Sequence, residues 1–158
     1  MIDTSLFVAP GPDQRLLAWQ VRLNADPAEV FRTWTTAEGL GALLDAEARV
    51  ELRIGGPIEV FFMPDAPEGS RGSEGCQFLA YVPDRMLAFS WNAPPSIPET
   101  RNLHTWVVME FDAAGEGSTD LTLTHLGFGE GDAWDETHAY FVRAWGMVID
   151  AMVARFGS

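Results

Sequence analysis

The sequence predicts a domain of the α+β class, with an antiparallel sheet and one long helix at the end of the chain. After residue 45, apolar and polar residues alternate in short segments, as they do in half-buried strands. The connections between these segments have hairpin lengths, which only antiparallel strands allow. From residue 133 to about residue 156, apolar residues recur at helical spacing. Helices that are segregated from the strands along the chain are typical of the α+β class.

Length and composition fit one domain over residues 1–158, of which residues 1–13 are expected to form a loose arm. The hydrophobic fraction of 47% is ordinary for a folded chain. Ten arginines, no lysine and 23 carboxylates give a net charge of −13. Such an acidic surface repels phosphate groups, which argues against nucleic acid and anionic membranes as partners. Because no signal peptide or apolar membrane span is visible, we expect a cytoplasmic protein.

The first third of the chain predicts a strand and then two short helices. Residues 14–24 alternate as a strand, with its apolar side chains on one face. In the segment that follows, Asp26 suits a helix N-cap and Pro27 suits the first helical position. Thr35 and Glu38 then have the spacing of a capping box, so a second helix is expected to begin there.

The middle of the chain predicts about six more strands, which would give a sheet of six or seven. Their expected ranges are 48–54, 57–63, 76–82, 85–92, 102–112 and 119–128. In the last of them, Leu121, Leu123 and His125 share the apolar face. Cys76, the one cysteine of the sequence, lies among apolar neighbours and is expected to be a small core residue.

The closing helix predicts a histidine on its buried face. With about 100° per residue, His138, Phe141 and Trp145 all fall within roughly 40° of Trp134. His138 is therefore expected to face the sheet from inside the apolar stripe. The acidic residues before it are expected to serve the start of the helix, with Asp132 as the N-cap and a carboxylate in the first turn complementing the helix dipole.

Such a helix needs a sheet that curves around it, and a curved sheet can leave a pocket. Pattern places four of the six tryptophans inward: Trp34, Trp91, Trp134 and Trp145. Packing in the core is the simplest role for each ring. Taken together, large rings with few polar groups are typical of a pocket for an apolar ligand.

Five segments, in one order along the chain, carry a family resemblance: "DPAEVFRTWTTAEGL" at 26–40, "VELRIGG" at 50–56, "YVPDRMLAFSW" at 81–91, "STDLTLTHLGF" at 118–128 and "YFVRAWGMVIDAMVARF" at 140–156. In these the chain resembles the START-like superfamily (SRPBCC, the helix-grip fold), in the branch related to the activator of the heat-shock-protein-90 ATPase. The resemblance implies a curved sheet wrapped around the C-terminal helix, with a deep cavity between them. Its members include carriers, cyclases and co-chaperones, so the fold does not define an activity.

We therefore predict a protein that binds a small hydrophobic molecule in an aromatic-lined cavity, without a cofactor. The expected ligand-contacting residues are Trp34, Phe62, Phe89, Trp91, Leu123, His125, Trp134, His138, Phe141 and Trp145. No metal is predicted, because Asp135 and His138 on the closing helix and His125 on the sheet would supply at most three ligands. The oligomeric state stays open, and a homodimer is one of the states allowed.

Two alternatives to a binding protein also stay open. One is an enzyme of cyclase or hydrolase type, in which His138, oriented by Asp135, acts as a general base. The other is an interaction protein similar to the chaperone-ATPase activator, which would present an exposed apolar patch. A binding protein is favoured over an enzyme, since the sequence contains no nucleophile elbow and no phosphate loop.

Overall fold

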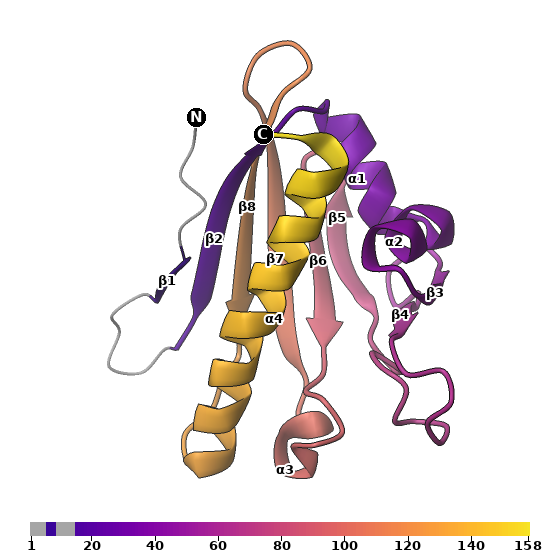
Figure 1. Ribbon diagram of the computed structural model, residues 1–158, viewed down its shortest axis with the longest axis vertical. Coiled ribbons are helices and arrows are strands. Elements are labelled where there is room, and N and C mark those ends of the chain that lie inside the picture. The colour runs from indigo at the N-terminus through magenta and orange to yellow at the C-terminus, as the bar shows by residue number, and fades with distance from the viewer. Residues whose placement is uncertain (1–5, 9–14) are drawn as a thin grey trace.

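The computed structural model describes residues 6–8 and 15–158 of the chain. In this part, a curved antiparallel sheet is covered on one face by the long helix α4 (Asp132–Phe156), as Figure 1 shows. Helices α1 (Pro27–Thr35) and α2 (Ala37–Leu44) follow the second strand and lie beside the upper half of α4. The α+β class, the two short helices and the long C-terminal helix are confirmed.

The main sheet has six strands in the described part of the chain, in the order β1-β2-β8-β7-β6-β5. Each strand runs antiparallel to its neighbours. Short connections join β5 to β6 and β7 to β8, as hairpin spacing predicted. The bounds are β1 (Leu6–Val8), β2 (Leu17–Leu23), β5 (Phe78–Val82), β6 (Met86–Trp91), β7 (Thr105–Ala113) and β8 (Thr119–Leu126).

Strands β3 (Glu47–Val50) and β4 (Ile58–Phe61) form a separate two-stranded sheet. The strand predicted over 48–54 is shorter, because the chain turns after Val50. Gly56 lies so close to the preceding backbone in this turn that a Cβ there would come within 2.1 Å of the carbonyl oxygen of Glu51. Ile54, which alternation placed on the apolar face, is 64% exposed as a result.

The prediction of a loose arm over residues 1–13 is wrong for residues 6–8. These three residues form β1, which pairs with β2 so that Leu6 lies opposite Trp19. The edge of β2 offers unpaired backbone groups, and a Leu-Phe-Val segment has the β propensity to use them. The rest of the predicted arm lies outside the described residues.

Of the predicted caps of the two short helices, that of α1 is confirmed and that of α2 lies one residue later. Asp26 is the N-cap of α1, but its carboxylate accepts from the backbone N–H of Gly117, at 3.0 Å, instead of from its own helix. The N-cap of α2 is Thr36 and not Thr35, because the hydroxyl of Thr36 accepts from the N–H of Gly39 at 3.1 Å. The hydroxyl of Thr35 donates back to a carbonyl of α1.

The core lies between α4 and the concave face of the main sheet. Along β6 the inward residues are Leu87, Phe89 and Trp91, and along β8 they are Leu121, Leu123 and His125, as alternation predicted. Cys76 is fully buried, as expected of a small core residue. Trp106 points to the other face of the sheet and is 42% exposed. The inward residues of β6 and β8 therefore form the sheet side of the core.

Candidate functional site

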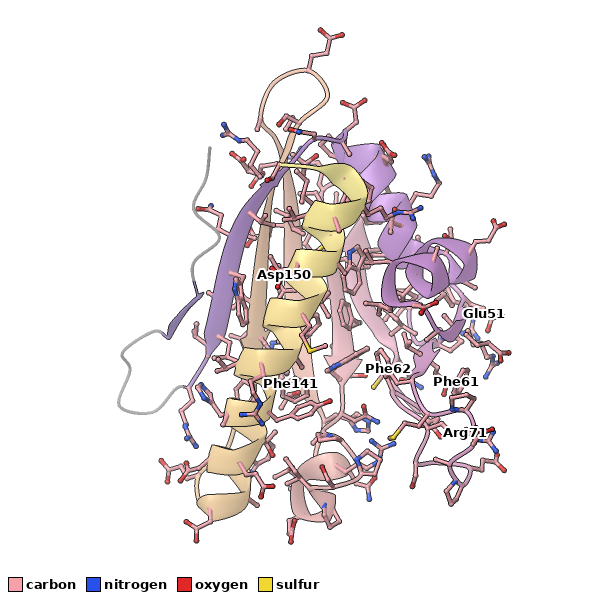
Figure 2. All side chains as sticks on the ribbon, in the orientation of Figure 1. Glu51, Phe61, Phe62, Arg71, Phe141 and Asp150 are labelled. Carbon is pink, nitrogen blue, oxygen red and sulfur yellow. The ribbon has the colours of Figure 1, made fainter. Side chains whose placement is uncertain are left out.

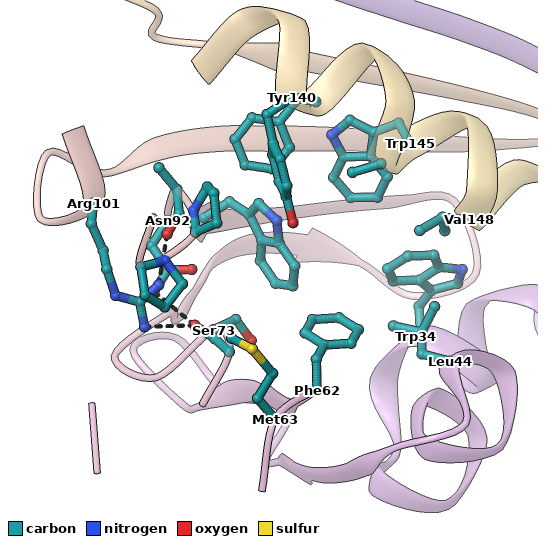
Figure 3. Close-up of a pocket in the computed structure, with 17 residues that line it drawn as sticks. Trp34, Leu44, Phe62, Met63, Ser73, Asn92, Arg101, Tyr140, Trp145 and Val148 are labelled. Atoms are coloured by element: carbon teal, nitrogen blue, oxygen red, sulfur yellow. Dashed lines mark hydrogen bonds between the residues drawn. The ribbon is translucent and has the colours of Figure 1, made fainter. Parts of the chain in front are cut away.

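A cavity of about 210 Å³ lies beside α4, between the helix and the ends of β4 and β6. Figure 3 shows its wall. Figure 2 shows two of its aromatic side chains, Phe62 and Phe141, on facing sides. Phe62 and Met63 are 49% and 47% exposed, so the cavity opens to solvent between them and the helix. The wall is formed by Trp34, Leu44, Phe62, Met63, Gly72, Ser73, Trp91, Asn92, Ala93, Pro94, Pro95, Arg101, Tyr140, Phe141, Ala144, Trp145 and Val148.

Helix α4 presents two neighbouring stripes, and only one of them was predicted. The predicted stripe, which includes Phe141 and Trp145, is buried against the sheet and reaches the cavity at its margin. A second stripe, Tyr140, Ala144 and Val148, follows i, i+4, i+8 spacing and lines the cavity. Helical periodicity also places Val148 in the inward stripe, so Tyr140 and Ala144 are the members of this second face that sequence reasoning missed, and the 140/144/148 spacing is the signal for them.

Three tryptophans form a connected group in the aromatic wall, which also contains Phe62, Tyr140 and Phe141. The ring centroids of Trp34 and Trp145 lie 6.4 Å apart, and those of Trp91 and Trp145 lie 6.0 Å apart. The indole N–H of Trp34 donates to the sulfur of Met152, at 3.4 Å, inside the core. That of Trp145 donates to Nδ1 of His125 at 2.9 Å. Because both N–H groups are satisfied in the core, these two residues offer carbon surface to a ligand.

His125 is fully buried behind this wall and has a role in positioning it. Since an indole N–H can only donate, Nδ1 of His125 must accept, and the ring proton lies on Nε2. Nε2–H then donates to the hydroxyl of Thr105 at 2.6 Å, and that hydroxyl donates to the carbonyl of Trp91 at 3.4 Å. Burial, and next the charge of His138, lower the pKa of His125 to about 3. The imidazole is therefore neutral, with one fixed tautomer.

The polar end of the cavity is organised by Arg101, the last residue of the short helix α3 (Pro98–Arg101). Its guanidinium donates to the carbonyls of Ala93 at 2.6 Å, Gly69 at 2.6 Å and Gly72 at 2.9 Å. It also lies 3.4 Å from a carboxylate oxygen of Glu74, with both side chains largely buried. Arg101 therefore ties α3 to the loop after β4, and its donors are already used. Sequence reasoning did not single out this residue.

Glu74 closes the same loop from the other side. Burial alone would raise the pKa of its carboxyl group, but backbone N–H donors from Arg71, Gly72 and Gly69 more than offset this and hold the pKa below its usual range. Gly69 N and Gly72 N both lie 2.6 Å from its oxygens. Nearby, the side-chain amide of Asn92 donates to the carbonyl of Gly72 at 3.2 Å. Charge-assisted hydrogen bonds to Glu74 and from Arg101 thus hold the loop in place.

Tyr140 brings a polar group to the otherwise aromatic part of the cavity. Figure 3 shows its side chain reaching from α4 with the hydroxyl directed toward the space in front of Phe62. Burial raises the pKa of Tyr140, against the smaller opposing effect of Arg143 and Arg101, so the phenol keeps its proton at neutral pH. No hydrogen bond to another of the described residues contributes to this pKa, so the hydroxyl is free to pair with a ligand or with solvent.

The structure places the ten predicted ligand-contacting residues in three groups. Five of them line the cavity: Trp34, Phe62, Trp91, Phe141 and Trp145. Phe89, Leu123 and His125 are fully buried behind that wall, and the ring of Phe89 stacks on Trp34 at 6.1 Å. Trp134 and His138 lie near the start of α4, where both rings contact Phe128 outside the cavity.

The predicted pair of His138 and Asp135 is not assembled at the cavity. Asp135 accepts from the guanidinium of Arg15 at 2.5 Å, and Arg15 also donates to the carbonyl of Gly129 at 3.0 Å. Nε2 of His138 is buried without a partner in the described structure. Burial, and then the charge of Arg15, lower the pKa of His138, while Asp135 acts in the opposite direction. Neither His138 nor Asp135, the pair of the general-base alternative, lines the cavity beside α4.

The start of α4 also differs from the prediction. Gly131, with a φ of 109°, occupies the N-cap position, and Asp132 is the first helical residue. A glycine suits this position because few other residues adopt a positive φ at low cost. Asp132 and Asp135 remain in the first turn, where carboxylates complement the helix dipole.

Within residues 6–8 and 15–158, no three His, Cys, Asp or Glu side chains gather in a way that could hold a metal ion. In the same residues, no helix combines the length and the apolar character needed to cross a membrane.

Comparison with known proteins places these features in a family. Residues 24–157 match the family described as activator of Hsp90 ATPase homolog 1-like protein. A comparison with curated proteins finds no match.

Solved structures share the fold at low sequence identity. A conserved protein of unknown function from Enterococcus faecalis has a TM-score of 0.69 and 14% identity, covering 93% of this chain and 74% of its own. An HSP90 activator from Plasmodium falciparum has a TM-score of 0.60 and 21% identity, covering 81% and 86%. The Aha1 dimer from Colwellia psychrerythraea has a TM-score of 0.64 and 14% identity, covering 88% and 94%.

Proposed function

The chain belongs to the activator of Hsp90 ATPase homolog 1-like family, with the START-like helix-grip fold, and from this premise we propose that it binds a small hydrophobic molecule in the cavity beside α4. The observation that carries the proposal is the open, aromatic-walled cavity itself. Side chains as large as Trp34, Trp91 and Trp145 surround it without filling it. Exposed apolar surface of this kind is costly in water, and a bound apolar molecule would remove the cost.

The composition of the wall supports binding more than catalysis. The charged group on the wall, Arg101, has its donors occupied by backbone carbonyls. His125 is buried behind the wall and neutral, and His138 lies outside it. Tyr140, the remaining titratable group of the wall, has a raised pKa and keeps its proton, so it can donate a hydrogen bond to a ligand but is a poor general base at neutral pH.

The experiment that tests the proposal fills the cavity from α4. Ala144 lines the cavity, whereas Ala139 lies on the exposed face of the same helix. Apolar probes, such as naphthalene and dodecanol, would be titrated while tryptophan fluorescence and melting temperature are followed. We expect binding to the unchanged protein and to Ala139→Phe, and at least tenfold weaker binding to Ala144→Phe. Equal binding by both variants, or none by the unchanged protein, would contradict the proposal.

A second candidate function is the stimulation of a chaperone ATPase. The family match supports it, and so does the fold shared with an HSP90 activator. Phe62 and Met63 add a pair of neighbouring apolar side chains that are about half exposed. We expect Phe62→Ser with Met63→Ser to abolish any stimulation of an Hsp90 ATPase measured with the unchanged chain. Absence of stimulation at saturating concentrations of the unchanged chain would remove this candidate.

The assembly and location proposed with this function are a homodimer and the cytoplasm. The homodimer is supported by a dimer among the structures that share the fold. Light scattering after gel filtration would test it, and a single species at the monomer mass of 17.4 kDa would contradict it.

A further inference from the structure

Resting on the proposed binding function, we propose that the ligand is an uncharged aromatic molecule of one or two rings that carries a hydroxyl or carbonyl oxygen, and that Tyr140 selects it by hydrogen bonding to that oxygen. Four properties of the cavity lead to this class: its size, the arrangement of its rings, the state of Arg101, and the hydroxyl of Tyr140.

The size of the cavity limits the ligand to a small ring system. Its volume is about 210 Å³. An apolar cavity of about 150 Å³ in another protein holds benzene. The present cavity therefore accepts one ring with substituents or two fused rings, and a longer chain would extend past Phe62 and Met63 into water.

The arrangement of the rings favours a flat, aromatic molecule. The ring of Trp145 neighbours those of both Trp34 and Trp91, with interplanar angles of 39° and 34° to them. Aromatic rings at centroid separations of about 4.5–7 Å attract each other in offset or edge-to-face arrangements. A planar ligand would continue this pattern, and Trp34 and Trp145 have no free N–H that it would need to satisfy.

The state of Arg101 makes the cavity unsuited to a carboxylate. Its guanidinium already donates to Ala93, Gly69 and Gly72, and it faces the carboxylate of Glu74. For an anionic ligand, the positive charge of Arg101 is already balanced, and the carboxylate of Glu74, which has the same sign as the ligand, lies nearby. Burying an unpaired carboxylate is strongly unfavourable, so an uncharged ligand is preferred.

The hydroxyl of Tyr140 makes the cavity suited to an oxygen. The hydroxyl is directed into the cavity, and no hydrogen bond joins it to another of the described residues, so solvent water is the partner open to it in the absence of ligand. A ligand that displaces this water must replace its hydrogen bond or leave the hydroxyl unpaired at a cost. A hydroxyl or carbonyl oxygen on the ligand can do so, whereas a pure hydrocarbon cannot.

The test compares three probes that share one ring system: 2-naphthol, naphthalene and 2-naphthoate. Affinities would be measured by calorimetry on the full chain and on two variants, Tyr140→Phe and Tyr81→Phe. Tyr81 is the other tyrosine of the sequence, and it packs outside the cavity. We expect the unchanged chain to bind 2-naphthol roughly two- to tenfold more tightly than naphthalene, because one hydrogen bond distinguishes them. It should bind 2-naphthoate most weakly. Tyr140→Phe should remove the preference for naphthol, with an affinity for naphthalene equal to or above that of the unchanged chain, whereas Tyr81→Phe should change neither.

The contrary outcomes separate this inference from the proposed function. Equal affinity for naphthol and naphthalene, or an equal loss of both in Tyr140→Phe, would overturn the role of Tyr140. Tightest binding of 2-naphthoate would overturn the uncharged class. If dodecanol binds and Ala144→Phe blocks it, while none of the naphthalene probes binds, the ligand class fails and the binding function stands. If no probe binds, both fail.

Discussion

The indole N–H of Trp145 donates across 2.9 Å to Nδ1 of His125, so a residue of the cavity wall is fixed by a buried imidazole on β8. The imidazole in turn donates to Thr105 on β7. This chain of hydrogen bonds joins α4 to two strands of the sheet. Because each member is buried, the loss of any one leaves a polar group without water to replace its partner.

The first prediction concerns pH. The pKa of His125 is about 3 in the folded chain and near 6.5 when unfolded, so the unfolded state binds the proton between these values. The contribution of His125 to the free energy of unfolding is therefore fully present above pH 6.5 and is lost as the pH falls toward 3. At pH 5 we expect a loss of about 2 kcal/mol from this group, measured by urea unfolding at pH 7 and pH 5.

A matched pair of variants assigns this loss to His125. His125→Gln should flatten the dependence of the unfolding free energy on pH, whereas replacement of the exposed His104 by Gln should leave it as in the unchanged chain. The same slope in all three proteins would show that His125 is not its source.

The second prediction concerns Thr105, which accepts from Nε2–H of His125. Thr105→Val keeps the shape of the side chain but leaves that donor unsatisfied in the core. We expect a loss of about 1–3 kcal/mol in unfolding free energy. Thr124→Val, on the opposite face of β8, is the control and should change stability by less than about 0.5 kcal/mol. An equal loss of unfolding free energy in the two variants would contradict the role of Thr105 as the acceptor for His125.

The third prediction concerns Arg101. Arg101→Met removes the donors that hold the carbonyls of Ala93, Gly69 and Gly72, and it leaves Glu74 without its cation. We expect a loss of about 3 kcal/mol or more, because a largely buried pair is broken on one side. Limited proteolysis should show earlier cleavage between residues 63 and 75. Arg49→Met removes exposed ion pairs and should cost less than about 1 kcal/mol.

The fourth prediction compares two helical glycines. A Cβ on Gly146 of α4 would have only the ring of Trp19 nearby, at 4.0 Å, which is an ordinary contact. Gly146→Ala should therefore raise stability by about 0.5–1 kcal/mol, since alanine favours the helix. A Cβ on Gly39 of α2 would come within 2.7 Å of the backbone of Thr33, so Gly39→Ala should lower the melting temperature. Melting curves of the two variants that shift in the same direction would count against this comparison.

The fold could be predicted from sequence where one face of a strand or helix is buried and the other is exposed. Alternation identified the inward residues of β6 and β8, and helical spacing identified Phe141 and Trp145. It failed around residues 51–56, where a tight glycine turn ends β3 despite an alternating sequence. Periodicity describes what a side chain would face if the element continued, and it does not say where the element stops.

The cavity was harder to predict, because its residues come from the margins of elements. Tyr140 lies beside the main stripe of α4, and Arg101 ends a helix of four residues, too short to show a period. His138 was placed correctly in angle along the helix, but it lies one turn too early to reach the cavity. Which part of a stripe meets a void depends on the positions of other elements, here the ends of β4 and β6.

The pairing of β2 with β8 also has a consequence for how the protein is made. Arg22 and Asp120 lie 98 positions apart in sequence and form a two-armed ion pair across these strands. The wall of the cavity likewise runs from Trp34 on α1 to Val148 on α4. A chain still on the ribosome that has not released α4 therefore has no cavity to occupy. Contacts between such distant segments make folding slow. A ligand can therefore assist folding only at the step in which α4 docks on the sheet and completes the cavity.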